Sequence, residues 1–203
     1  MNPDVTSVPP AEDGLTVWTI GHSTRSAEDF LAVLAAHRIE LMGDVRRFPG
    51  SRRLPQFQQT ALEHSLASAG IAYRWIPELG GRRSTSAASA ALADADWPTS
   101  GWRHAAFRAY AAHVATAEFR EGLATLVDVA YGFRTVIMCA EVLWWRCHRR
   151  LVSDVLVATG HAVVHIRDAT HAEPHRLAAP AQLIDGWLSY ASAEADAGPE
   201  QRR

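Results

Sequence analysis

Residues 135–150 read TVIMCAEVLWWRCHRR. The β-branched, apolar beginning, Thr135 to Met138, is typical of a buried strand, and an apolar helical pattern follows from about Trp144 to Ala158. Cys139 and Glu141 therefore stand where a strand ends. In an open α/β sheet, ligands bind in the crevice beyond the carboxyl ends of the strands. This stretch is the leading candidate for the functional site.

The composition indicates one globular domain. The chain has 203 residues, of which 48% are hydrophobic and 21% charged, which is enough for a buried α/β core. No apolar run approaches the roughly 20 residues of a membrane span, and the start of the chain lacks the pattern of a signal peptide. We therefore expect a soluble cytoplasmic protein that does not contact a membrane. Two cysteines form no disulfide framework, so each serves packing, catalysis, redox chemistry or metal binding.

All 20 basic residues are arginine, although the net charge is only -2. A genome rich in G and C would account for the absence of lysine, but it does not account for the positions of the arginines. They cluster at Arg46-Arg47, Arg52-Arg53, Arg82-Arg83 and Arg146 with Arg149-Arg150. The planar guanidinium binds phosphate or carboxylate with two hydrogen bonds, so these clusters predict an anion-binding pocket. For any single pair, a solvated surface position is the alternative.

Hydrophobic periodicity predicts strands alternating with helices. The expected strands are residues 15–20, 39–45, 71–76, the run into Cys139, and 162–166. The expected helices begin at Ser26 and near Thr60 and cover 102–114, 117–131, 144–158 and 180–193. This order predicts a three-layer α/β fold with a mostly parallel, five-stranded sheet and helices on both faces.

The expected domain organisation is simple. Residues 1–14 form a disordered tail, 15–176 form the α/β domain, and 177–203 add a C-terminal helix and a frayed end. An Ala/Ser-rich insertion at 84–101 interrupts the domain and is either a functional lid or a linker.

Each predicted strand ends in polar residues, and parallel strands place these ends on one rim. The junctions are His22-Ser23, Asp44 with Arg46 and Arg47, Glu78 with Arg82 and Arg83, Cys139 with Glu141, and Arg167-Asp168. Guanidiniums and carboxylates gathered beside a thiol make a plausible site.

Four of these segments together resemble the DUF488 family, a domain of unknown function. They are Thr19 to Ser23, Asp44 to Pro49 with Ser51-Arg52, Leu79 to Arg82, and Met138 to Glu141 with Cys147 to Arg150. The resemblance covers approximately Val17 to Ile166, and the Ala/Ser-rich insertion is the departure from it. It implies a compact α/β fold with a polar rim, and it brings no reaction.

Several residues of the rim are candidates for catalysis or binding. The catalytic candidates are Cys139, Glu141, His22 and Asp44; the anion-binding candidates are Arg46, Arg47, Arg52, Arg82, Arg146 and Arg149; and the stacking candidates are Trp144 and Trp145. A thiolate at Cys139 would be stabilised by nearby guanidiniums and a helix amino end, whereas Cys147 lies on an apolar helical stripe and is interpreted as a packing residue. Packing is also the alternative for Cys139, an ion pair for Glu141, and a structural hydrogen bond for the histidines.

Known site signatures are mostly absent. A tyrosine-phosphatase loop needs an arginine six residues after its cysteine, and here Trp145 occupies that position. The phosphate-binding P-loop and the dinucleotide fingerprint are missing. Cys139, Cys147 and His148 are acceptable metal ligands, but their spacing matches no zinc finger, so the sequence requires no cofactor.

Three classes of function remain open. The first, which we favour, is an enzyme acting on a phosphorylated small molecule, a nucleotide or a nucleic acid. The second is a nucleic-acid-binding module without catalysis, and the third is a thiol-based or metal-based sensor. The favoured class explains why carboxylates and a thiol accompany the arginines. The sequence leaves substrate, reaction and oligomeric state open.

Overall fold

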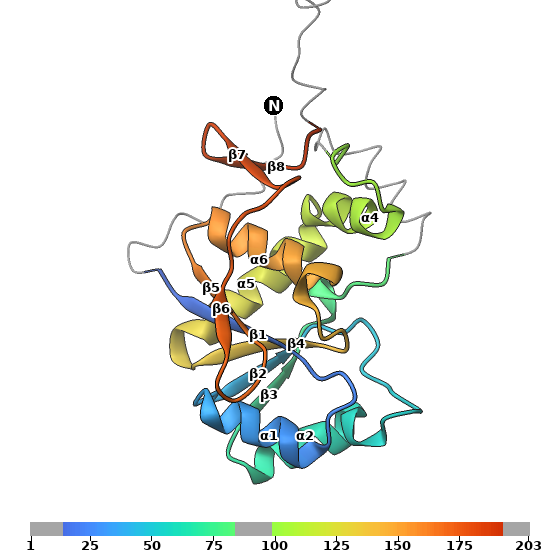
Figure 1. Cartoon of the computed structure of the whole chain (residues 1–203), viewed down its shortest axis with the longest axis vertical. Helices are drawn as coiled ribbons and strands as arrows, with labels where there is room; N and C mark the ends of the chain where they lie inside the picture. The colour runs from blue at the N-terminus through green and yellow to red at the C-terminus, as the bar shows by residue number, and fades with distance from the viewer. Residues whose placement is uncertain (1–13, 84–98, 193–203) are drawn as a thin grey trace, which may run out of the picture.

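The computed structural model describes residues 14–83 and 99–192. Its main sheet has six strands in the order β3-β2-β4-β1-β5-β6 (Figure 1). The strands are β1 (Thr16–Gly21), β2 (Leu41–Asp44), β3 (Ala72–Trp75), β4 (Thr135–Cys139), β5 (Ala162–Ile166) and β6 (Ala172–Pro174). The first five are parallel, as predicted, and β6 pairs with β5 in the antiparallel direction. The predicted count of five strands missed this short edge strand.

Helices cover both faces of the sheet. Helices α1 (Ala27–Ala36) and α2 (Gln59–Ser68) pack on one face, where Phe30, Leu34 and Leu66 join Met42 and Met138 in a buried cluster. On the other face lie α4 (Ala105–Val114), α5 (Ala117–Gly132) and α6 (Arg149–Ala158) (Figure 1). The fold is therefore the predicted three-layer α/β arrangement.

Two helix starts follow from local chemistry. Ser26 caps α1 by accepting a hydrogen bond from the Asp29 amide at 3.0 Å, and Thr116 caps α5 in the same way at 3.2 Å. The expected start near Thr60 is wrong by one residue, because α2 begins at Gln59 after the cap residue Gln58. Just beyond its end, Gly70 adopts a φ of 72°, a conformation that glycine supplies where a helix stops.

Two further predictions are wrong. The helix expected over 180–193 is replaced within the described residues by a hairpin of β7 (Gln182–Ile184) and β8 (Trp187–Ser189). Asp185 and Gly186 both have positive φ, which is the backbone of a two-residue hairpin turn. The helix expected from Trp144 begins only at Arg149. A 3-10 turn, η3 (Trp144–Arg146), precedes it, and Cys147 is extended between the two.

Shorter features complete the described chain. Two further 3-10 turns, η1 (Pro55–Phe57) and η2 (Pro77–Leu79), follow β2 and β3 on the way to the next elements. The expected N-terminal tail, most of the expected insertion (84–98) and the expected frayed end lie outside the described residues. Among the helices of the described ranges, none is long and apolar enough to cross a membrane.

Candidate thiol and imidazole site

The carboxyl ends of the three central strands lie level with one another. In the sheet register, Gly21 of β1 pairs with Cys139 of β4, and Asp44 of β2 pairs with Met138. The pairing continues past the strand ends, because the amides of His22 and Val45 donate to the carbonyls of Cys139 and Met138. The predicted polar rim is therefore present, and β4 places Cys139 at its centre.

Cys139, Cys147 and His148 form a compact cluster, which we call the thiol–imidazole cluster. Nδ1 of His148 lies 3.9 Å from Sγ of Cys139 and 3.5 Å from Sγ of Cys147. One ligand atom from each of the three residues lies within 4.8 Å of the others. Cys147 has an extended backbone between η3 and α6. The chain turns back toward the end of β4 here, and this brings Cys147 and His148 close to Cys139. The interpretation of Cys147 as a packing residue missed these polar contacts, although the side chain is buried.

The tautomer of His148 follows from its second nitrogen. Nε2 lies 3.1 Å from the carbonyl oxygen of Val45, which can only accept, so Nε2 carries the hydrogen. In the neutral ring, Nδ1 then has a free lone pair directed at both sulfurs. This nitrogen can take a proton from a thiol or bind a metal ion.

The pKa values of the two thiols are shifted in opposite directions. The hydrogen bond to Cys147, together with burial, holds the pKa of Cys139 well above its ordinary value. Burial opposes ionisation of Cys147 as well, but the hydrogen bond from Cys139 and the nearby His148 and Arg149 bring the pKa of Cys147 well below its ordinary value. The prediction of a depressed pKa at Cys139 is therefore wrong. The thiolate belongs to Cys147, with Cys139 as its donor.

Arg149 is a buried cation beside this pair. Its side chain is almost completely inaccessible, and its Nη groups donate to the carbonyls of Glu141 and Val142 and to Oγ1 of Thr19. Its Nε is buried without a hydrogen-bond partner, and no carboxylate forms an ion pair with it among the described residues. A buried guanidinium without a counterion favours a neighbouring thiolate over a thiol.

Glycine permits the close packing around the cluster at two positions. A Cβ added to Gly81 would lie 2.4 Å from Nδ1 of His148, so the loop after η2 can cover the imidazole only because no side chain intervenes. A Cβ on Gly21 would lie 2.1 Å from the carbonyl oxygen of Glu141. The loop that presents Glu141 and Val142 therefore rests directly on the end of β1.

Two of the predicted anion-binding arginines are already paired within the protein. Arg46 donates through Nε and Nη2 to the fully buried Asp44, and its Nη1 donates to the carbonyl of Phe57 at 2.7 Å. Although burial opposes it, this ion pair raises the pKa of Arg46. Arg47 shares Glu118 with Arg83. Asp44 and Arg46 thus bind each other within the rim, and their predicted roles in catalysis and anion binding stay predictions.

Three of the other predicted anion-binding arginines are exposed. Arg82 and Arg146 are both exposed and adjoin the cluster through the chain, since Arg82 follows Gly81 and Arg146 precedes Cys147. Arg52 is exposed on the loop after β2. No ion pair is formed by these three within the described ranges.

The remaining catalytic candidates differ in their surroundings. The carboxylate of Glu141 is exposed and accepts a hydrogen bond from the amide of Leu143 at 3.2 Å. His22 is buried, its ring stacks on Phe57 at 4.0 Å, and its Nδ1 bonds the carbonyl of Ser23. Burial lowers the pKa of His22 to about 4, so it is neutral at physiological pH. The carboxylate of Glu141 can therefore exchange protons with solvent, whereas the main role of His22 is to pack against Phe57.

The two stacking candidates are not equivalent. One face of Trp144 is covered by His165, whose ring lies parallel at 4.0 Å, and its indole nitrogen donates to Glu173 at 2.9 Å. Trp145 is 38% exposed and meets Trp144 edge to face. Only Trp145 offers an open ring to a ligand.

Sequence reasoning missed a buried hydrogen-bond chain that ends at Arg149. Oγ1 of Thr19 lies 2.7 Å from Nδ1 of His165, whose Nε2 lies 2.9 Å from Nδ1 of His175, and Nε2 of His175 lies 2.9 Å from the buried carboxylate of Asp154. At the two ends of this chain, Arg149 can only donate and the carboxylate of Asp154 can only accept. The sequence signal for this hydrogen-bond chain was His165, a histidine within the otherwise apolar strand expected over 162–166.

The family match agrees with this geometry. Residues 26–156 match the family described as Domain of unknown function DUF488. The chain belongs to this family. The matched range holds the segments around Asp44, Gly81, Cys139 and Cys147, whereas the motif Thr19 to Ser23 lies before it. No curated protein and no solved structure matches the chain.

Proposed function

We propose that this DUF488 domain is a thiol-dependent enzyme that acts on a substrate carrying a phosphate or another anionic group. The observation that carries the proposal is that the lone pair of His148 Nδ1 faces both sulfurs while Val45 holds Nε2. A nucleophile within reach of a base that a third group orients is the arrangement used in nucleophilic catalysis.

The roles follow from exposure and charge. Cys139 is the more exposed thiol and is the group that would attack the substrate. As the new sulfur–substrate bond forms, the proton of Cys139 passes through the neighbouring Cys147 thiolate to Nδ1 of His148, and the displaced group leaves with its electron pair. The thiolate of Cys147 and the cation of Arg149 lie beside this centre, so the imidazolium that forms is balanced by the thiolate.

The substrate class is inferred from the exposed arginines. Arg82 and Arg146 adjoin the cluster and are free of ion pairs among the described residues, unlike Arg46. A phosphate held between them would lie beside the sulfurs, and Glu141 would exchange protons with the leaving group. The substrates that fit are phosphorylated small molecules, nucleotides and nucleic-acid ends.

Peptide-resolved alkylation tests the reactive thiol. In the chelator-treated protein, iodoacetamide should label Cys139 or Cys147 at neutral pH in a His148-dependent way, and pyrophosphate should slow the labelling. The double variant Arg82→Ala with Arg146→Ala should lose the protection, while Arg120→Ala, on α5, should keep it. Labelling that is equally slow in the native protein with and without chelator, and fast only after unfolding, would contradict the proposal.

A second function is favoured by one observation. Two sulfurs and an imidazole nitrogen within 4.8 Å form a three-residue set of the kind that binds zinc or another transition metal and leaves one position open. A metal-based sensor or enzyme would use the same cluster. Cobalt(II) added to the chelator-treated protein should then give thiolate-to-metal absorption that Cys147→Ser abolishes, and a protein that gives none has no such metal site.

A further inference from the structure

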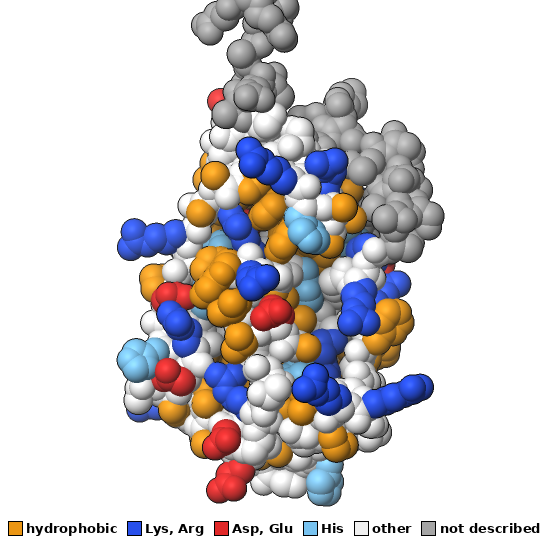
Figure 2. Space-filling model, turned by 45° about the vertical axis from the view of Figure 1, so that its right-hand side comes forward, with side chains coloured by type: hydrophobic (Ala, Val, Ile, Leu, Met, Phe, Trp, Pro, Cys, Tyr) orange, Lys and Arg blue, Asp and Glu red, His pale blue; other side chains and the backbone are white. Residues whose placement is uncertain are grey.

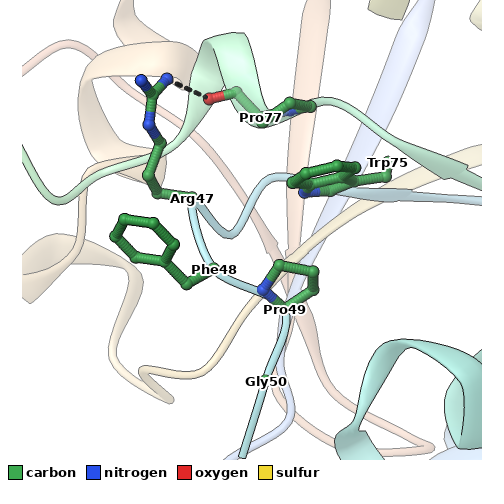
Figure 3. A pocket seen from close by; sticks show the side chains of 6 residues that line it. All are labelled: Arg47, Phe48, Pro49, Gly50, Trp75 and Pro77. Carbon is green, nitrogen blue, oxygen red and sulfur yellow. Dashed lines mark hydrogen bonds between the residues drawn. The ribbon is translucent and has the colours of Figure 1, made fainter.

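An open groove lies beside the thiol–imidazole cluster, at the ends of β2 and β3. Its volume is about 450 Å³, and it is lined by Arg47, Phe48, Pro49, Gly50, Trp75 and Pro77. The rings of Phe48 and Trp75 lie on opposite sides of the opening, with Pro77 above Trp75 and Pro49 below it in the view of Figure 3. We call this feature the aromatic groove.

The aromatic groove is exposed yet preformed. Phe48 is 68% exposed and Trp75 is 40% exposed. The indole nitrogen of Trp75 donates to the carbonyl of Arg46 at 3.0 Å, and this bond fixes the ring at the edge of the sheet. Large aromatic side chains that are open to solvent on both sides of a groove, one of them fixed by a hydrogen bond, indicate a ligand with a flat apolar face.

The charges around the groove select the ligand. Residues 46–53 contain four arginines and no acidic residue. Arg52 and Arg53 are exposed, and neither forms an ion pair with another described residue. Glu118 is occupied by Arg47 and Arg83. In the face shown in Figure 2, basic and hydrophobic side chains are interspersed and acidic ones are fewer.

We propose that the aromatic groove binds single-stranded nucleic acid, with one base between Phe48 and Trp75 and the phosphates along Arg52 and Arg53. Every base has a face that stacks on aromatic rings, and the arginines supply the charge that a sugar–phosphate backbone requires. A proline-rich peptide would use the rings and prolines, but it would leave the arginines without a role.

The groove is connected to the cluster through a few residues. Val45 accepts the hydrogen bond of His148, and Phe48 follows three residues later. A strand bound in the groove therefore passes near Cys139 and Arg82. The binding proposal stands independently of the thiol chemistry, since none of its residues belongs to the cluster.

Fluorescence anisotropy with a labelled oligothymidylate tests this inference. The full chain should bind it at low salt, and Phe48→Ala should weaken binding about tenfold, in line with the loss of one stacking partner. Phe48→Tyr should restore it. The matched control is Phe133→Ala, because Phe133 is 48% exposed but lies before the amino end of β4, outside the aromatic groove.

Charge is tested in the same assay. The double variant Arg52→Ala with Arg53→Ala should bind more weakly and with a shallower dependence on salt concentration. A labelled oligoproline peptide serves as the competing probe. The inference is overturned if the oligonucleotide does not bind, if Phe48→Ala and Phe133→Ala bind it equally well, or if oligoproline alone binds. Because Cys139→Ser leaves the groove intact, retained binding in that variant separates this proposal from the proposed reaction.

Discussion

The His148 ring lies between the carbonyl of Val45 and the sulfurs of Cys139 and Cys147, and Gly81 packs against it. At the scale of single residues, this placement determines which nitrogen is free. The other tautomer, with its hydrogen on Nδ1, would point an N–H at the thiols and could not accept their proton. The geometry of the site therefore depends on a backbone carbonyl and on the absence of one side chain.

Gly81→Ala is expected to displace His148. The added methyl group would overlap the imidazole, so the ring has to move and the base is withdrawn from the thiols. We expect alkylation of Cys139 to slow by roughly tenfold and stability to fall by about 1–3 kcal/mol, the usual cost of overpacking. Gly132→Ala is the control, since nothing lies within 4 Å of a Cβ there. Equal alkylation rates in the two variants would argue against the role of Gly81.

At the scale of elements, α6 connects the cluster to the buried hydrogen-bond chain. Arg149 at its start contacts Thr19, and Asp154 on the next turns accepts hydrogen bonds from His175 and from the hydroxyl of Tyr190, the residue after β8. The C-terminal hairpin is thereby joined to the centre of the sheet. Helix α6 thus carries both ends of the buried hydrogen-bond chain, the donor Arg149 and the acceptor Asp154.

Asp154→Asn is expected to destabilise the protein by about 2–3 kcal/mol. The amide cannot replace a carboxylate that accepts from both His175 and Tyr190 in a buried setting, and one partner is left unsatisfied. Urea unfolding measures the loss. Asp128→Asn, on the exposed face of α5, should change stability by less than about 0.5 kcal/mol. Similar midpoints for the two variants would show that the chain of contacts adds nothing to stability.

Features that depend on residues close in the sequence could be predicted, whereas features that depend on residues distant in the sequence could not. The strands around Val17, Val136 and Val163 and the caps at Ser26 and Thr116 follow from periodicity and local hydrogen bonding, so they could be predicted. The polar rim followed from the parallel strand order. The hairpin was missed because an apolar pattern outweighed the Asp185-Gly186 turn signal.

The site itself was predictable in place but not in detail. Cys139 was placed correctly at the end of β4, because a strand end can be read from the sequence. The partnership of Cys147 depends on where α6 starts, and the pairing of Arg46 with Asp44 depends on side-chain orientation within the loop. The spacing of these residues along the sequence predicts neither contact. Phe48 and Trp75 belong to strands and loops distant in sequence, so their groove appears only once β2 and β3 pair.

At the scale of the whole molecule, buried neutral histidines link stability to pH. Burial lowers the pKa values of His22 and His113 to about 4 and that of His165 to about 3. In the unfolded chain these groups titrate near 6.5, so between about pH 6.5 and pH 4 the unfolded state binds more protons than the native state. Their contribution is complete above the unfolded pKa and is lost as the pH falls.

Urea unfolding at about pH 7 and about pH 5 should show this loss. Each histidine contributes a slope of up to about 1.4 kcal/mol per pH unit within the window. His113→Gln should reduce the total slope by one such contribution and His64→Gln, exposed on α2, should leave it unchanged. A stability that is flat between the two pH values would contradict the burial of these rings as neutral groups.

The central claim is that Cys139 and Cys147 act as one unit, with a thiolate on Cys147 held by the hydrogen bond from Cys139 and by Arg149. The most direct measurement is thiolate ultraviolet absorbance as a function of pH in the chelator-treated protein and in the two single variants. The native protein should show one thiolate ionising below the ordinary cysteine pKa of about 8.5. Cys147→Ser should abolish that early ionisation, and Cys139→Ser should shift it upward. Two ordinary titrations, each removed independently by its own variant, would contradict the account.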